Sequence, residues 1–139
     1  MAAPIERILP AAPGAPRTAR GFATTAVSRL LPAPIAHALC EDIELVVSEL
    51  VTNAVRAGSD TVTISVEHVP GELGDDKIVL RVTDNATGWP EQRDAGVHDV
   101  TGRGLTLVSA ICSAWGVRLI ATGKIVWAEL AIPRHSDHS

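Results

Sequence analysis

The stretch from Glu49 to Gly58, ELVTNAVRAG, constrains this chain most, because an apolar stripe and a polar row run along it together. Apolar residues around it recur at the i, i+3, i+4, i+7 spacing of one helix side. They are Ile43, Val46, Val47, Leu50, Val51 and Ala54. We therefore expect a helix that begins near Ile35 or Glu41, ends near Ala57 and buries this side in the core.

A polar row lies on another side of the same predicted helix. Glu49 and Asn53 are one helical turn apart, and Arg56 follows in the next turn. A carboxylate can orient a nucleophile, an amide oxygen can ligate Mg²⁺ and a guanidinium can bind phosphate. A solvated helix face has the same pattern. The row is thus a candidate ligand site, with the solvated face as the alternative.

Composition narrows the class of protein. A length of 139 residues with 46% hydrophobic residues is typical of one domain with a buried core. The net charge is −4 and the basic residues are scattered, so we expect a small molecule or a protein as partner rather than nucleic acid. Cys40 and Cys112 are far apart in sequence and are predicted to be reduced, buried thiols. No membrane-spanning run or leader is seen, which predicts a cytoplasmic protein without a membrane partner.

The remaining elements follow from the change of hydrophobic period along the chain. The predicted helices are Arg17–Leu31, stopped by Pro32 and Pro34, and Gly102–Cys112. The predicted strands are a short edge strand near 5–9, then Thr61–Glu67, Lys77–Asp84, Trp115–Ala121 and Ile125–Ile132, with a turn at 122–124 between the last two. Helices come early and strands late, which indicates an α+β two-layer sandwich with a mixed, mostly antiparallel sheet.

Two glycine-containing segments flank a long predicted loop. The segment DNATG places Asp84 at a strand end, where its carboxylate can accept a hydrogen bond from an exocyclic amine such as that of adenine. An Asx turn is the simpler interpretation of that segment. Gly102-Arg103-Gly104 opens a predicted helix, where free N–H groups attract phosphate, although a hinge has the same composition. Between them, residues 85–101 have the length of a lid.

The order of these segments resembles that of the GHKL ATPase superfamily, whose domains have the Bergerat, or histidine kinase-like, fold. The resemblance covers nearly the whole chain and is nearest to the small anti-sigma-factor, serine-protein kinase branch. It implies one ATP-binding domain over residues 1–139, with flexible tails at about 1–4 and 134–139.

The resemblance also implies roles for individual residues and ATP and Mg²⁺ as cofactors. In SELVTNAV, Glu49 corresponds to the catalytic base, Asn53 to the Mg²⁺ ligand and Arg56 to a phosphate-contacting residue. In DNATG, Asp84 corresponds to the residue that binds the adenine amine. The other implied nucleotide-binding residues are Ala86, Gly88, Gly102, Arg103, Gly104 and Leu105.

Three positions depart from the family pattern. Ala86 replaces a glycine, Ala57 stands where His or Tyr is frequent, and Ile125 stands where a Thr hydroxyl is expected to contact nucleotide. The resemblance predicts an ATP-dependent protein serine/threonine kinase that binds a sigma factor and phosphorylates an anti-anti-sigma (STAS-type) antagonist, with a homodimer also implied. The alternative is a non-catalytic nucleotide-sensing module.

Overall fold

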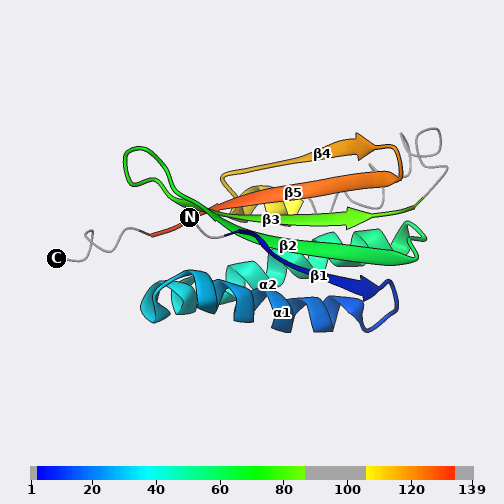
Figure 1. Cartoon of the computed structure of the whole chain (residues 1–139), viewed down its shortest axis with the longest axis horizontal. Coiled ribbons are helices and arrows are strands. Elements are labelled where there is room, and N and C mark those ends of the chain that lie inside the picture. The colour runs from blue at the N-terminus through cyan, green and yellow to red at the C-terminus, as the bar shows by residue number, and fades with distance from the viewer. Residues whose placement is uncertain (1–2, 87–105, 134–139) are drawn as a thin grey trace.

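A computed structural model describes residues 3–86 and 106–133 of the chain. The elements are β1 (Ile5–Pro10), α1 (Ala15–Leu30), α2 (Ala33–Arg56), β2 (Thr61–Val69), β3 (Lys77–Asp84), β4 (Ala114–Ile120) and β5 (Gly123–Ala131), with residues 106–111 also helical. Figure 1 shows α1 and α2 side by side along one face of the sheet. The predicted α+β two-layer fold is confirmed.

The sheet contains five strands in the order β1-β2-β3-β5-β4. Every pairing among the described strands is antiparallel, including the β1 edge strand, so none of them supplies the parallel pair of the mixed sheet we predicted. The strand β3 lies in the middle of the sheet, paired with β2 on one side and with β5 on the other. Residues at each end of β3 are therefore paired with residues of both β2 and β5.

The helix α2 buries the predicted apolar stripe completely. It begins at Ala33, earlier than either predicted start, because Pro34 lies in its first turn, where the missing N–H leaves no helical hydrogen bond unmade. It ends before Gly58, whose φ of +86° is the left-handed backbone that glycine adopts at helix ends. Pro34 thus starts the second helix, although we predicted that it would help to end the first.

The helix α1 presents a small-residue face to the rest of the molecule. Four of its five buried residues are alanines: Ala15, Ala19, Ala23 and Ala26. Short side chains let α1 pack closely against α2 and β2. Across the two helices, Arg20 Nη1 donates a hydrogen bond to Ser48 Oγ at 2.9 Å. This contact fixes α2 immediately before Glu49.

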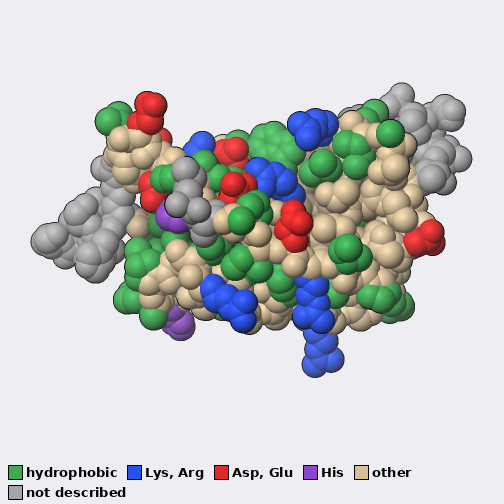
Figure 2. All heavy atoms as spheres, in the orientation of Figure 1, with side chains coloured by type: hydrophobic (Ala, Val, Ile, Leu, Met, Phe, Trp, Pro, Cys, Tyr) green, Lys and Arg blue, Asp and Glu red, His purple; other side chains and the backbone are tan. Residues whose placement is uncertain are grey.

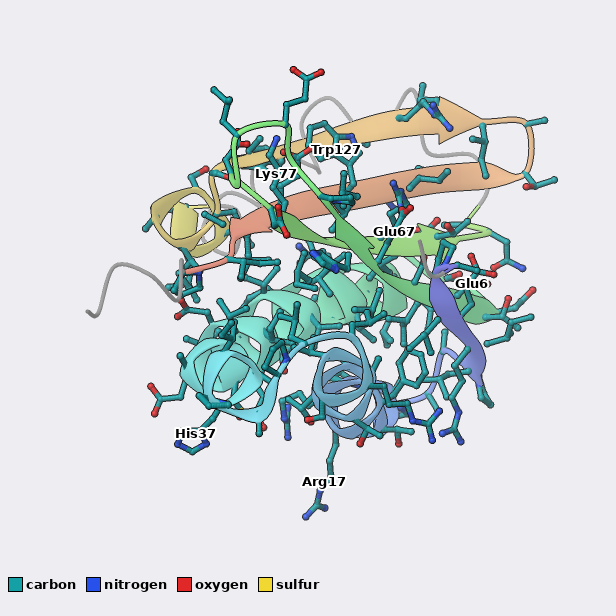
Figure 3. All side chains as sticks on the ribbon, turned by 60° about the vertical axis from the view of Figure 1, so that its left-hand side comes forward. Glu6, Arg17, His37, Glu67, Lys77 and Trp127 are labelled. Carbon is teal, nitrogen blue, oxygen red and sulfur yellow. The ribbon has the colours of Figure 1, made fainter. Side chains whose placement is uncertain are left out.

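The other face of the sheet is not covered by α1 and α2. Figure 3 shows Lys77 and Trp127 on this side, while Arg17 and His37 project outwards from the helix layer. The Trp127 ring lies over Gly116, where a Cβ would approach ring atom Cζ2 to 2.6 Å, so the bare backbone makes room for the indole. In the view of Figure 2, acidic and basic side chains are interspersed.

The two cysteines are free thiols, but both are only half-buried, whereas we predicted that they would be buried. Partial burial, with a smaller contribution from the Asp42 carboxylate, raises the pKa of Cys112 from 9.0 to about 11. No helix in residues 3–86 or 106–133 has the length and apolar character needed to cross a lipid bilayer.

Candidate functional site

The polar row on α2 contains a buried amide that has no hydrogen-bond partner among the residues that the structure describes. Asn53 is only 9% exposed, and its side chain forms no hydrogen bond with any residue that the structure describes. Glu49, one turn earlier, is half-buried and forms no ion pair within the same residues. Arg56 is exposed in the last turn of α2. A solvated face explains Arg56 but not Asn53, because burying an unbonded amide costs free energy unless a ligand satisfies it.

Asp84 is buried at the C-terminal end of β3, on the sheet face that carries the core. Its Oδ1 accepts a hydrogen bond from the Ala86 backbone N–H at 3.1 Å, which is the Asx turn of the simpler interpretation. Its Oδ2 accepts a hydrogen bond from Lys124 Nζ at 2.5 Å. The turn and a buried ion pair therefore hold the carboxylate from both sides.

Lys124 is a site residue that sequence reasoning missed. We placed it in the turn at 122–124, but it belongs to β5, directly opposite Asp84, and is 8% exposed. Gly123 makes this possible: its φ is +153°, and a Cβ there would overlap the Asp84 carbonyl oxygen and lie 2.8 Å from the Asn85 Cα. The start of β5 therefore comes close enough to β3 for Lys124 to reach Asp84. In the sequence Gly123 alone does not reveal this, because a glycine beside a lysine is equally typical of a solvated turn.

Asn85 joins the end of β3 to the segment that follows α2. Its Oδ1 accepts hydrogen bonds from the backbone N–H of Asp60 at 2.8 Å and of Thr61 at 3.4 Å, and lies 2.7 Å from Ser59 Oγ. Its own N–H donates to Ser59 Oγ at 3.0 Å. These bonds tie the connection after α2 to the residue that follows Asp84.

The structure thus brings two predicted groups to one end of the molecule. The helix α2 packs against β2 and β3, and β2 begins beside Asp84, with Val62 opposite that residue. The polar row of α2 and the buried Asp84 are therefore linked through a short, hydrogen-bonded connection. Ala86, two residues after Asp84 in the chain, is also buried.

Five further residues were predicted to bind the nucleotide. Gly88, Gly102, Arg103, Gly104 and Leu105 lie outside the described residues. The predicted helix from 102 to 112 is confirmed over residues 106–111, where Val108 is buried in the core.

Ile125 does not stand where we expected it. It lines a groove with Arg118 and Trp127 on the sheet face away from α1 and α2. Because side chains alternate along a strand, the residue of this segment that faces Asp84 is Lys124. The missing Thr hydroxyl at 125 therefore removes no polar group from the Asp84 side of the sheet.

The structure is therefore an α+β two-layer domain, in which two helices cover an antiparallel sheet and buried polar residues lie at the end of its central strand. Residues 9–130 match the family described as histidine kinase-like ATPase domain, and the chain belongs to this family. No curated protein matches the chain. Family membership implies ATP as the ligand. Mg²⁺ fits the residues present, since Asn53 offers a buried amide oxygen without a described protein partner.

Proposed function

We propose that the chain is an ATP-binding regulator of the anti-sigma-factor type, with protein serine/threonine kinase activity towards a STAS-type antagonist. The observation that carries the proposal is the pair of partner-poor polar residues on α2, half-buried Glu49 and buried Asn53, one turn apart. Polar groups held in this state without protein partners are suited to a ligand or substrate. The family resemblance is the basis for proposing a sigma factor and an antagonist as partners, and for proposing a homodimer.

The roles follow the chemistry of each side chain. Asn53 would hold Mg²⁺, which neutralises charge on the transferred phosphoryl group when bound. Arg56, exposed one turn later, would contact phosphate. Glu49 would accept the proton of a Ser or Thr hydroxyl as that oxygen bonds to the γ-phosphorus and ADP departs. Arg20 contributes indirectly, because its bond to Ser48 fixes the turn that carries Glu49.

The test is phosphoryl transfer from Mg-ATP to candidate STAS-type proteins, with the modified Ser or Thr located by mass spectrometry. Glu49→Gln should lower the transfer rate by about 10²-fold or more while Mg-ATP affinity stays near that of the wild type. Glu44→Gln, on the same helix, is the matched control and should leave the rate unchanged. Equal transfer by Glu49→Gln and wild type would contradict the role of Glu49.

A second candidate is a non-catalytic module in which ATP sets affinity for a partner. It is favoured by Ala86, because this family-divergent residue is buried and its backbone N–H donates to the Asp84 carboxylate, so a methyl group replaces the bare glycine of the family close to that carboxylate in the chain. An antagonist that binds only with Mg-ATP, yet never gains phosphate, would favour this candidate. Stoichiometric phosphorylation would exclude it.

A further inference from the structure

The buried ion pair of Asp84 and Lys124, where β3 and β5 lie side by side, combines a hydrogen-bond acceptor with a hydrogen-bond donor. We propose that Asp84 and Lys124 together read the base of the nucleotide: the carboxylate accepts from the exocyclic N6 amine of adenine, and the ammonium donates to ring N1. This inference rests on the ATP binding proposed above. It adds a base-contacting residue, Lys124, that forms an ion pair with Asp84.

The polarity of the pair matches one edge of adenine. That edge presents an N–H donor at N6 beside an acceptor at N1. An ionised carboxylate only accepts hydrogen bonds and an ammonium only donates them. With Lys124 Nζ 2.5 Å from Asp84 Oδ2, an acceptor and a donor lie next to one another, as the two neighbouring atoms of the base require.

The backbone holds both groups in place before any ligand binds. The Ala86 N–H fixes Asp84 Oδ1, and the β3–β5 register sets Lys124 opposite Asp84. The close approach at Gly123 keeps the two strands together at this point. Because both side chains are buried, little rotamer freedom is left to lose on binding, and their hydrogen bonds act in a low-dielectric environment.

The residue next to Lys124 on the neighbouring edge strand β4 is apolar. Leu119 of β4 lies directly opposite Lys124, so both side chains are on one face, and Leu119 is 56% exposed. Val117, two residues earlier, is also exposed on that face. A base has two apolar faces and a polar edge, so a buried polar pair bordered by exposed apolar side chains suits it.

Lys124 could instead compete with the base. In that role its ammonium would occupy the Asp84 carboxylate oxygens to which the N6 amine must donate. A carboxylate has about four lone-pair sites, and within residues 3–86 and 106–133 the bonds from Ala86 and Lys124 use two of those on Asp84. The amine and the ammonium can therefore bind Asp84 at the same time. Competition and base reading predict opposite effects when the ammonium is removed.

The experiment measures dissociation constants of the full chain for Mg-ATP, Mg-GTP, Mg-1-deaza-ATP and Mg-7-deaza-ATP by titration calorimetry. The 1-deaza analogue replaces N1 by CH, and the 7-deaza analogue makes the same change at N7, away from the pair. Wild type should bind 1-deaza-ATP at least about tenfold more weakly than ATP, as expected for loss of one charge-assisted hydrogen bond, and 7-deaza-ATP as tightly as ATP.

Two variants then assign the effect to Lys124. Lys124→Met and Lys124→Gln should both bind ATP more weakly, and their ratio of 1-deaza-ATP to ATP dissociation constants should fall towards one. Lys124→Gln keeps a polar partner for Asp84, so the test remains possible if the Met variant does not fold. Lys77→Gln, on the other end of β3, is the control and should keep the wild-type ratio.

Each other result overturns the proposal. A wild-type ratio near one, an unchanged ratio in the folded Lys124 variants, or tighter ATP binding by them would each contradict base reading by Lys124 while leaving ATP binding intact. Tighter binding of Mg-GTP than of Mg-ATP would assign the pair to guanine, whose edge has the reverse polarity. If no protein binds any nucleotide at millimolar concentration, the proposed function itself fails.

Discussion

The two ends of the β3–β5 pair carry the same kind of ion pair in opposite surroundings. At one end, Lys77 Nζ lies 3.1 Å from Glu129 Oε1, and the Lys77 side chain is 41% exposed. At the other end, Lys124 meets Asp84 with both side chains buried. Water screens the first pair, so it contributes little to stability. The second is costly to desolvate, and the fold retains it at the end of the sheet where we propose that the base of the nucleotide binds.

This difference separates a surface pair from a site pair. The exposed end needs no special backbone, whereas the buried end depends on Gly123, on the Asx turn at Ala86 and on the Asn85 connection. Three independent local features therefore converge on Asp84. A binding site requires its charged group to be held in place by surrounding contacts such as these. A surface charge that only keeps the protein in solution does not require them.

Removing one partner at each end should give the largest contrast. Lys124→Met leaves Asp84 buried without its counter-ion and is expected to lower the free energy of unfolding by about 3–5 kcal/mol. Lys77→Met should lower it by less than about 1 kcal/mol. Urea unfolding followed by circular dichroism measures both. Similar losses in the two variants would show that the buried pair contributes no more to stability than the exposed pair.

The two asparagines near the site offer a second contrast. Asn85→Ala removes the acceptor shared by Asp60 and Thr61, and we expect a loss of about 1–3 kcal/mol in the same unfolding assay. Asn53→Ala removes an amide without a described protein partner, so the apo protein should keep its stability within about 1 kcal/mol. If Asn53→Ala proved the more damaging change, Asn53 would be a structural residue.

A smaller effect is expected away from the pair, at Cys112. Its folded-state pKa of about 11 lies above the ordinary value of 9.0, so the folded protein keeps the thiol proton that the unfolded chain loses in between. The contribution of Cys112 to stability should be complete below about pH 9 and be lost as the pH rises to about 11. Comparing wild type with Cys112→Ser across this range by urea unfolding isolates the effect. Parallel stability curves would contradict the raised pKa.

The helices, the strands and the place of Asp84 at the end of β3 were predictable because their signals are local. The apolar period of α2 and the alternation in β2 are each contained in one segment of the chain. Lys124 was not predictable, because Thr-Gly-Lys alone is typical of a solvated turn, and its burial depends on Asp84, 40 residues away in sequence. The role of Asn85 depends in the same way on Ser59.

Thermal unfolding with and without millimolar Mg-ATP tests whether ATP binds between this end of the sheet and α2. At about 100 times the dissociation constant, the ligand should stabilise wild type by about 2.7 kcal/mol and raise its Tm. Asn53→Ala should melt like wild type without ATP, yet lose the shift. No shift in folded wild type at saturating Mg-ATP would contradict ATP binding, and an equal shift in Asn53→Ala would contradict the role of Asn53 in it.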